Sequence, residues 1–421
     1  MNFLKYVIIF IILRTSVAAV DYSFDLQKYQ KKTYDFSFSL ELTPEFIKYN
    51  KESIPFKLNG KNDNYDLIYK SNITFKGNYD FWQSKLEWEI TDILSYSERN
   101  NFDNSFKIME LLLNSSWENN LSLEAGKKSL KWGKGYVKNP VAFASREKDI
   151  NNTTSTLEGF WLLNSSFVKS PNSFIKNYSL TFTILPEYNE LNSEFSKEEK
   201  NINYLLKTYF LIHNIDWGSY FLINSNNHKI GFDFAYNLLS NWEIHSEYAY
   251  SFKTQKELIS ENVTLKTQTI DTHDFLLGTR VLFNTNTTVI LEFFHNDFGL
   301  KENETATFWQ ITEQNSYNNE KVNILRRYQK NNLNKQFVMQ NYLYSKISQP
   351  EPFDMLYFTP SVFLLYNLVD KSIMSGLELK YSRFDNLNLQ LKSNYFFGKN
   401  HTEYGEKLSY FKLLINLEIL L

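Results

Sequence analysis

The chain has 421 residues, with 45 lysines and arginines against 47 aspartates and glutamates, so its formal charge is only −2. It contains no cysteine, which excludes disulfide bonds and thiolate metal sites. Aromatic residues make up 17% of the chain although the mean hydropathy is −0.42, and strands that alternate apolar and polar side chains account for both values.

The N-terminal residues 1–19 predict a signal peptide. Met1–Lys5 carries one positive charge, Tyr6–Leu13 is a short apolar run, and Ser16–Ala19 supplies the small residues at which a signal peptidase cleaves. The apolar run is far shorter than the roughly 20 residues that cross a bilayer as a helix, so export is favoured over an N-terminal anchor. Residues 20–421 are predicted to form a single domain.

Alternation with a period of two recurs from about residue 33 onward, whereas helical periodicity is almost absent. The pattern predicts an all-β protein of about 18 strands, with 16 as the alternative count. The clearest segment is the C-terminal one, where every second residue is apolar: Phe411, Leu413, Ile415, Leu417, Ile419 and Leu421. Strands are expected to start near residues 33, 65, 79, 105, 121, 156, 178, 201, 216, 229, 241, 270, 287, 336, 355, 373, 387 and 409.

Short and long connections alternate between the predicted strands. Tight turns are expected at Gly77-Asn78, Glu118 to Asn120, Asn214-Ile215, Ser240-Asn241, Asn284 to Asn286 and Asp385-Asn386. Long polar connections are expected at 45–64, 92–104, 133–155, 186–200, 253–269, 298–335 and 399–408. This rhythm is typical of a transmembrane antiparallel up-and-down β-barrel of the bacterial outer membrane, with short periplasmic turns and long extracellular loops. A secreted β-sandwich or solenoid is the alternative, but neither requires this rhythm.

If the apolar face of each strand contacts lipid, the opposite face lines the lumen. That face carries both charges, and about 18 strands leave room for an aqueous channel. Only residues 20–32 precede the first strand, so no plug domain is expected, and no cofactor. The predicted lumen wall includes Lys70, Lys76, Lys85, Glu87, Arg280, Glu292 and Lys392. The alternative role for each of them is a wall ion pair that stiffens the barrel.

The segment Gly126–Asp149 holds seven basic and two acidic side chains, a local charge of +5 in a nearly neutral chain. Taken alone, such a patch suggests binding of nucleic acid or phosphate. Strand counting instead places it after the outward end of the fifth strand, as the third long loop of the barrel. No nucleic-acid partner is therefore expected.

This segment also resembles part of a known class of barrels. The sequence LSLEAGKKSLKWGKGYVKNPVAF (121–143) is similar to porin-like outer-membrane barrels in which a strand ends in Gly-Lys/Arg-Lys/Gln, followed by Trp-Gly and Asn-Pro. TTVILEFFHND (287–297) and EPFDMLYFTPSVF (351–363) resemble other parts of these poorly characterised barrels. The resemblance implies that the third loop folds inward and narrows the pore. The predicted constriction residues are Lys127, Lys128, Lys131, Trp132, Gly133, Lys134, Gly135, Lys138 and Arg146.

Lysines held in a constriction raise the local concentration of anions and select solutes by charge. The sequence therefore predicts an outer-membrane porin for passive diffusion of small hydrophilic solutes, anions among them. Expected partners are outer-membrane lipid, lipopolysaccharide, the barrel assembly machinery and the solutes, and a homotrimer is left open. One alternative is that the basic segment is a solvated outer loop whose lysines bind lipopolysaccharide phosphates. Another is a surface-binding, adhesion or assembly barrel without open conductance, and the length of the 298–335 loop is consistent with this function.

Two histidines lie next to aspartates, an arrangement that some hydrolases use for catalysis. Pairing around the predicted turn at 284–286 brings His273 and His295 close together near the outer rim, beside Asp274 and Asp297. His273 lies on the same face as Phe275, so both histidines are expected at the lipid interface, where amphipathic rings are common. No enzymatic activity is expected.

Overall fold

The computed structural model describes residues 32–59, 63–98, 101–117, 120–150, 157–171, 174–195, 200–315 and 319–421. Residues 34–421 form one compact unit and residues 1–33 another, of which only Lys32 and Thr33 are described. The predicted signal peptide, residues 1–19, lies outside the described residues.

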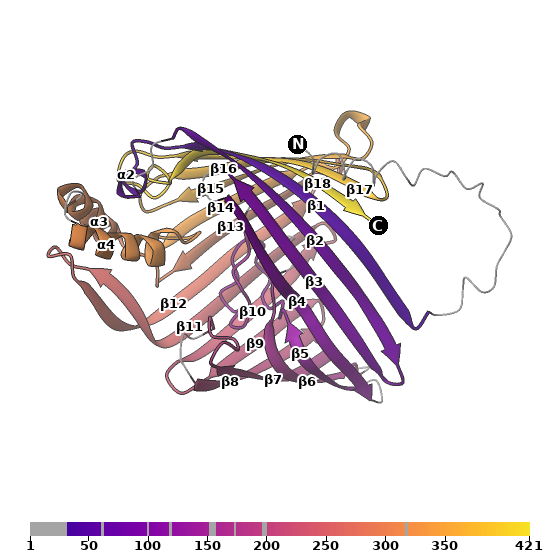
Figure 1. The fold of residues 1–421 in the computed structure, drawn as a ribbon. Helices are drawn as coiled ribbons and strands as arrows, with labels where there is room; N and C mark the ends of the chain where they lie inside the picture. Colours follow the sequence, from indigo (N-terminus) through magenta and orange to yellow (C-terminus); the bar gives the residue numbers. More distant parts are fainter. Residues whose placement is uncertain are drawn as a thin grey trace. The chain divides into compact units, whose positions relative to one another are not determined.

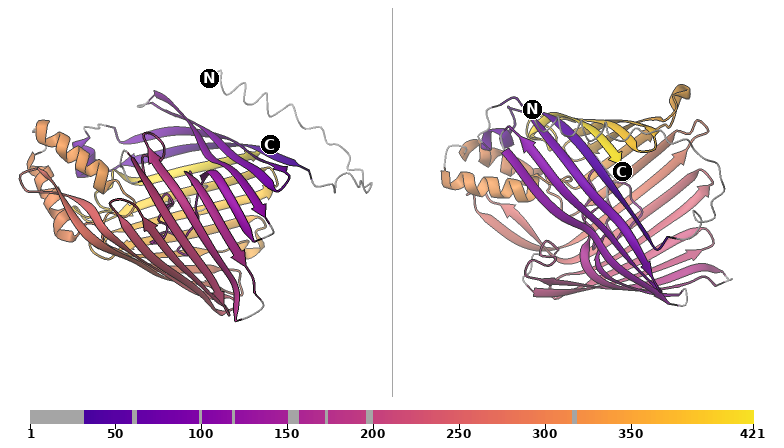
Figure 2. Two further views of the ribbon diagram at one scale, coloured as in Figure 1. Left: turned by 90° about the horizontal axis from the view of Figure 1, so that it is seen from below. Right: turned by 45° about the vertical axis from the view of Figure 1, so that its right-hand side comes forward.

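The unit is a closed barrel of 18 antiparallel strands (Figures 1 and 2). Each strand pairs with the next along the chain, and β18 pairs with β1, so the sheet has no free edge. The predicted fold class is therefore confirmed, with 18 strands rather than 16. The strands are β1 (Tyr34–Tyr49), β2 (Tyr65–Phe81), β3 (Ser84–Ser97), β4 (Asn101–Trp117), β5 (Leu121–Lys128), β6 (Phe160–Lys169), β7 (Ile175–Tyr188), β8 (Lys200–Ile212), β9 (Ile215–Ile223), β10 (His228–Leu239), β11 (Trp242–Ile259), β12 (Leu265–Leu282), β13 (Thr288–Asn296), β14 (Asn341–Ser348), β15 (Phe358–Asn367), β16 (Ile373–Phe384), β17 (Leu387–Phe397) and β18 (Ser409–Leu420).

Helices occur in the connections. They are α2 (Ile54–Leu58), α3 (Glu302–Asn315), α4 (Asn319–Tyr328), the π-helical turn η2 (Gln329–Leu333) and the 3-10 turn η3 (Pro352–Asp354). No helix in the described part of the chain is long and apolar enough to span a membrane. The sequence reading expected only a long polar loop at 298–335, whereas α3, α4 and η2 occupy much of it. Their apolar side chains, such as Phe308 and Leu325, are buried against other parts of the barrel.

The predicted assignment of faces holds along the wall. In β11, Glu243, His245 and Glu247 point inward, and the last two are 0% and 1% exposed. Trp242 and Tyr248, which alternate with them, are 41% and 38% exposed on the outer face. Because a period-two pattern sends neighbouring residues to opposite faces, one face of the strand carries the exposed apolar rings and the other faces the interior of the barrel.

Three connections differ from the prediction. Gly77-Asn78 was expected to form a turn but lies inside β2, and the turn follows Phe81. At Gly77 a Cβ would lie 2.5 Å from the Trp88 ring, so glycine is needed there for the indole of the next strand rather than for a turn. The segments 92–104 and 253–269 were expected to be long loops. Strands β3, β4, β11 and β12 run through most of both, because strands that extend beyond lipid lose the apolar alternation by which they are recognised.

We call the end of the barrel that carries the long connections 50–64, 129–159, 297–340 and 398–408 the outer end. The opposite end carries mostly tight turns, such as Trp82-Gln83 between β2 and β3. Its one longer connection is residues 349–357, between β14 and β15.

Candidate functional site

The connection between β5 and β6 lies within the barrel rather than above it (purple in Figure 1). We call its residues 129–150 the inner loop. Val137 and Val141 in this loop are 1% and 0% exposed, values that a loop in open solvent would not reach. Its partners are inward-facing residues of strands between β6 and β13, so it lines one side of the lumen.

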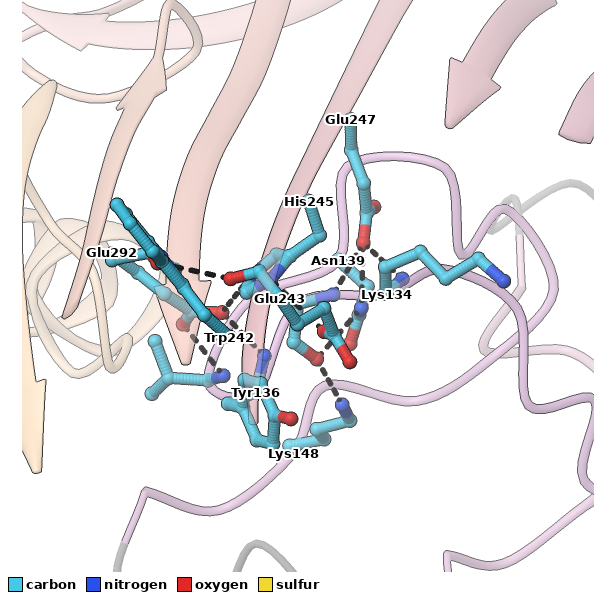
Figure 3. Close-up of polar contacts among 12 residues, drawn as sticks. Lys134, Tyr136, Asn139, Lys148, Trp242, Glu243, His245, Glu247 and Glu292 are labelled. Carbon is cyan, nitrogen blue, oxygen red and sulfur yellow. Dashed lines mark hydrogen bonds and ion pairs between the residues drawn. The ribbon is translucent and has the colours of Figure 1, made fainter. Parts of the chain in front are cut away.

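One buried glutamate of the wall holds the tip of the inner loop. Glu247 accepts hydrogen bonds from the backbone N–H groups of Lys134 (2.5 Å), Gly135 (2.6 Å) and Val141 (3.2 Å), and from the side-chain amide of Asn139 (2.8 Å) (Figure 3). Four donors on a single carboxylate compensate for the cost of burying its charge. Glu247 is therefore an anchor of the inner loop.

A second glutamate holds the next residues of the loop. Glu292 on β13 accepts from the N–H groups of Tyr136 (2.7 Å) and Val137 (3.2 Å). Its Oε1 also lies 3.0 Å from Nε2 of His245, whose Nδ1 is 3.4 Å from Oε1 of Glu243 (Figure 3). The histidine thus bridges two carboxylates directly beneath the loop. Glu292 was predicted as a lumen-wall residue, and the structure places it in the anchor of the loop.

Two glycines let the loop backbone close around Glu247. Gly133 has φ +97°, and a Cβ there would lie 2.7 Å from Oε1 of Glu247. At Gly135 a Cβ would lie 2.0 Å from the carbonyl oxygen of Lys138. At 133 the positive φ favours glycine, and at both positions the space left for a side chain admits only glycine. Both glycines were predicted constriction residues, and both enable the turn of the loop.

Apolar packing supports the polar anchors. Trp132 is buried, and its ring lies 5.4 Å from that of Tyr220 on β9. Further along, the loop packs against wall residues of β6 to β11, and the buried loop residues are Leu130, Val141, Phe143 and Ala144. Each large apolar side chain that is fully buried contributes roughly 1.5–3 kcal/mol. The inner loop is therefore fixed by a small apolar core as well as by Glu247 and Glu292.

Three of the predicted constriction residues are neutralised locally. Lys127 lies 2.7 Å from Glu158, and Lys128 lies 2.5 Å from Glu124. Arg146 pairs with Glu158 and with Glu194. Glu158 is shared with Lys107, so Glu124, Glu158 and Glu194 offset most of the positive charge at the root of the loop.

The other basic residues of the loop form no direct ion pair within the described residues, although Asp233 and Glu243 lie near Lys134 and Asp274 lies near Lys138. Lys131 is exposed, the Lys134 ammonium lies 5.7 Å from the centre of the Tyr209 ring, and that of Lys138 lies 5.2 Å from Phe337. Lys148 donates to the carbonyl oxygen of Gly135 at 2.7 Å, and burial lowers the pKa of this lysine. The positive charge of the loop that is not held in a direct ion pair thus resides mainly on Lys131, Lys134 and Lys138.

Most of the predicted lumen-wall residues form ion pairs, three of them between neighbouring strands and one, Lys85–Glu87, within β3. The pairs are Lys70–Glu45 (2.8 Å), Lys76–Glu89 (3.1 Å), Lys85–Glu87 (2.6 Å) and Lys392–Glu378 (3.7 Å). Arg280 is exposed to the lumen and interacts with the Tyr136 hydroxyl of the loop. The wall opposite the inner loop is therefore polar and close to charge balance.

Gly278 gives a direct test of the histidine bridge. A Cβ at this position would lie 2.2 Å from Nε2 of His245, so Gly278→Ala is expected to push the imidazole away from Glu292. We expect a loss of about 1–3 kcal/mol in the free energy of unfolding, measured with denaturant. In the background of His245→Ala the same substitution should cost much less, because the clash is removed. Equal costs in both backgrounds would contradict the role of the bridge.

The connections at the outer end pack together around a buried carboxylate. Glu403, between β17 and β18, accepts from the Tyr342 hydroxyl (2.5 Å), the Asn367 amide (2.8 Å) and the Val338 N–H (3.2 Å). Its neighbour Glu406 accepts from the N–H of Ile54 at 2.7 Å. Connections far apart in sequence are thus joined into one assembly at the outer end.

Lower pH is expected to tighten this assembly. Burial raises the pKa of Glu403 above its ordinary value of 4.5, although Lys407 lies 3.8 Å away. A carboxyl whose folded pKa is raised contributes stability that is fully present below its unfolded pKa and is lost as pH rises through the folded pKa. Amide exchange in residues 301–333, corrected for intrinsic rates, should therefore slow as pH falls from neutral toward 5. Glu403→Gln should remove this dependence, and an unchanged dependence would exclude Glu403 as its source.

The two histidines near the outer rim contact different partners. Nδ1 of His273 lies 2.7 Å from the Tyr248 hydroxyl, whereas Nδ1 of His295 lies 2.7 Å from Oδ1 of Asn341 and its Nε2 lies 3.9 Å from Oδ1 of Asp297. His295 pairs across the sheet with Phe275, as predicted, and both histidines share the outward face of their strands. No group of three or more potential metal-binding side chains occurs among the described residues.

Comparison with known proteins identifies the fold. No family model matches the chain, and no curated protein matches its sequence. Among solved structures, a BenF-like porin from Pseudomonas fluorescens Pf-5 is similar at a TM-score of 0.56 and 6% identity, covering 93% of this chain and 99% of that one. Two Pseudomonas aeruginosa structures also match. OccK2 (OpdF) in complex with glucuronate has a TM-score of 0.52 and 8% identity, covering 92% of this chain and 98% of that one. The outer membrane protein opdK has a TM-score of 0.50 and 7% identity, covering 92% of this chain and 99% of that one. The chain has the fold of porin-like outer-membrane barrels, and its sequence identity to these three structures is 6–8%.

Proposed function

We propose that this protein is an outer-membrane channel for passive diffusion of small hydrophilic solutes, narrowed by its inner loop. The observation that carries the proposal is the attachment of residues 129–150 to the inside of a closed barrel by Glu247 and Glu292. A loop held in this way reduces the cross-section of the lumen without sealing it with a separate domain. The ion-paired wall opposite the loop suits a hydrated path.

The proposal includes a preference for anions. Lys131, Lys134 and Lys138 carry the positive charge of the loop that forms no direct ion pair with a described carboxylate. Positive charge fixed in a narrow, low-dielectric passage raises the local concentration of anions and excludes cations. One structurally similar barrel was solved in complex with glucuronate, a sugar acid, and this supports small organic anions as the solute class. Lys127, Lys128 and Arg146 remain at the root of the loop and have a supporting role.

The membrane context belongs to the same proposal. We infer a location in the bacterial outer membrane, with lipid and lipopolysaccharide around the barrel and with insertion by the barrel assembly machinery. Chemical cross-linking of the purified barrel would test whether it assembles as a homotrimer.

Uptake into liposomes tests the solute class. Liposomes that contain the purified protein should take up a sugar acid such as glucuronate faster than a neutral sugar of equal size. Equal rates would contradict the anion preference but leave the channel intact. Absence of uptake of either solute would favour the second candidate function, a surface-binding barrel, for which the packed helices α3 and α4 at the outer end would provide the binding surface.

A further inference from the structure

A groove runs along the outer face of the barrel at its outer end, away from the lumen. It has a volume of about 660 Å³ and is lined by the ends of β1, β17 and β18 together with the connection 398–408. Its lining includes Lys48, Tyr395, Phe397, Gly405, Tyr410 and Phe411. Clefts of roughly 300–1,000 Å³ are the size that holds small ligands.

The register of the strands shows that these side chains face outward. In β1, Ile47 and Tyr49 are buried on the inward side, so Lys48 between them points away from the lumen. Lys48 pairs with Phe411, whereas Tyr49 pairs with Ser409, which leaves Tyr410 as the extra residue of a β-bulge. The bulge turns Tyr410 outward, where it is 44% exposed.

Aromatic rings form a continuous surface along the groove. Tyr395 lies 4.6 Å from Phe411 and 6.1 Å from Phe397 between ring centres, and Phe411 lies 6.4 Å from Phe46. Tyr395 and Phe397 are 43% and 54% exposed despite these contacts. An apolar surface of this kind at the edge of a lipid-facing wall fits acyl chains and the lipid–water boundary.

The charge of the groove is positive. Lys48 is exposed and forms no ion pair or hydrogen bond with the described residues. The residues that line the groove include no acidic side chain. A ligand that carries an acyl chain and a negatively charged headgroup would therefore contact the rings with one part and Lys48 with the other.

We propose that this groove binds the phosphorylated, acylated glycolipid of the outer leaflet, lipid A, with an acyl chain on the aromatic surface and a phosphate on Lys48. The groove lies at the end of the barrel that faces the outer leaflet in the proposed orientation. The inference rests on the proposed outer-membrane location, and it is independent of conductance.

Native mass spectrometry of the purified full chain in detergent tests the proposal. The protein is titrated with bisphosphorylated lipid A, with dephosphorylated lipid A and with phosphatidylethanolamine. We expect the phosphorylated form to bind most tightly, and Lys48→Met to weaken it about fivefold while leaving the dephosphorylated form unchanged. Tyr395→Ala should weaken both forms of lipid A. Lys176→Met, which removes an exposed lysine at the opposite end of the barrel, should change neither.

Other results would overturn the inference. Equal binding of lipid A with and without phosphate would show that the groove does not recognise the phosphate. Equal binding to wild type and to Lys48→Met would show that Lys48 does not hold it. If a second copy of the chain covers the groove instead, Tyr395→Ala should dissociate an oligomer without altering lipid binding. The β-sheet circular dichroism spectrum of Lys48→Met should equal that of wild type, which confirms a folded barrel whether or not the protein conducts and so separates failure of this inference from failure of the proposed channel.

Discussion

Replacement of Glu247 by alanine is expected to release the inner loop and to raise the single-channel conductance at least twofold. The substitution removes the acceptor of three backbone N–H groups and one of the two acceptors of the Asn139 amide, which also donates to the carbonyl oxygen of Gly135. Each unsatisfied buried group costs about 1–3 kcal/mol, so the total is comparable with the burial of two or three of the apolar side chains that also hold the loop. The tip of the inner loop, from Gly133 to Val141, should then leave the wall, and the lumen should widen.

The matched control is Glu378→Ala on β16. Glu378 also faces the lumen, but it pairs with Lys346 and Lys392 and has no hydrogen bond to the inner loop. Its loss should alter conductance little. Glu292→Ala removes the second anchor and should act in the same direction as Glu247→Ala. Unchanged conductance in both anchor variants, with the barrel still folded, would mean that the loop does not limit the pore.

Reversal of charge at Lys131 and Lys134 is expected to convert an anion-selective channel into a cation-selective one. These lysines form no direct ion pair with a described carboxylate, so Lys131→Glu with Lys134→Glu replaces positive by negative charge on the inner loop. The measurement is the reversal potential across a bilayer that separates two KCl concentrations, and its sign should change.

The paired lysines provide the control for this experiment. Lys127→Gln with Lys128→Gln removes charge that Glu158 and Glu124 already compensate, so the reversal potential should shift much less. An equal shift from both pairs would indicate a general electrostatic effect of the barrel. No shift from Lys131 and Lys134 would place their side chains outside the path of the ions.

The sequence was informative where local patterns determine structure. Alternation of apolar and polar residues predicted most strand starts to within a few residues, because a membrane barrel repeats one environment on each face of every strand. It failed where strands leave the lipid, as in the outer parts of β11 and β12. It also missed α3 and α4, whose apolar side chains Phe308 and Leu325 are spaced among asparagines and charges and find their partners only in the folded assembly.

The candidate site was only partly predictable for a different reason. The inward course of the loop was expected from its resemblance to other barrels and from strand order. The anchors could not be found in this way, because Glu247 lies more than 100 residues from the N–H groups that donate to it. The alternation of residues along β11 shows only that Glu247 faces the lumen. Pairing of Lys127 and Lys128 with glutamates is likewise a product of the folded geometry. Charge counting therefore overstated the number of free cations in the segment.

The central claim is that the lumen conducts. Purified protein added to a planar lipid bilayer should produce discrete current steps at constant voltage, and wild-type steps should be smaller than those of Glu247→Ala because the inner loop remains in place. The reversal potential in a KCl gradient should show preference for chloride. A folded protein that inserts into the bilayer and gives no steps would contradict the account.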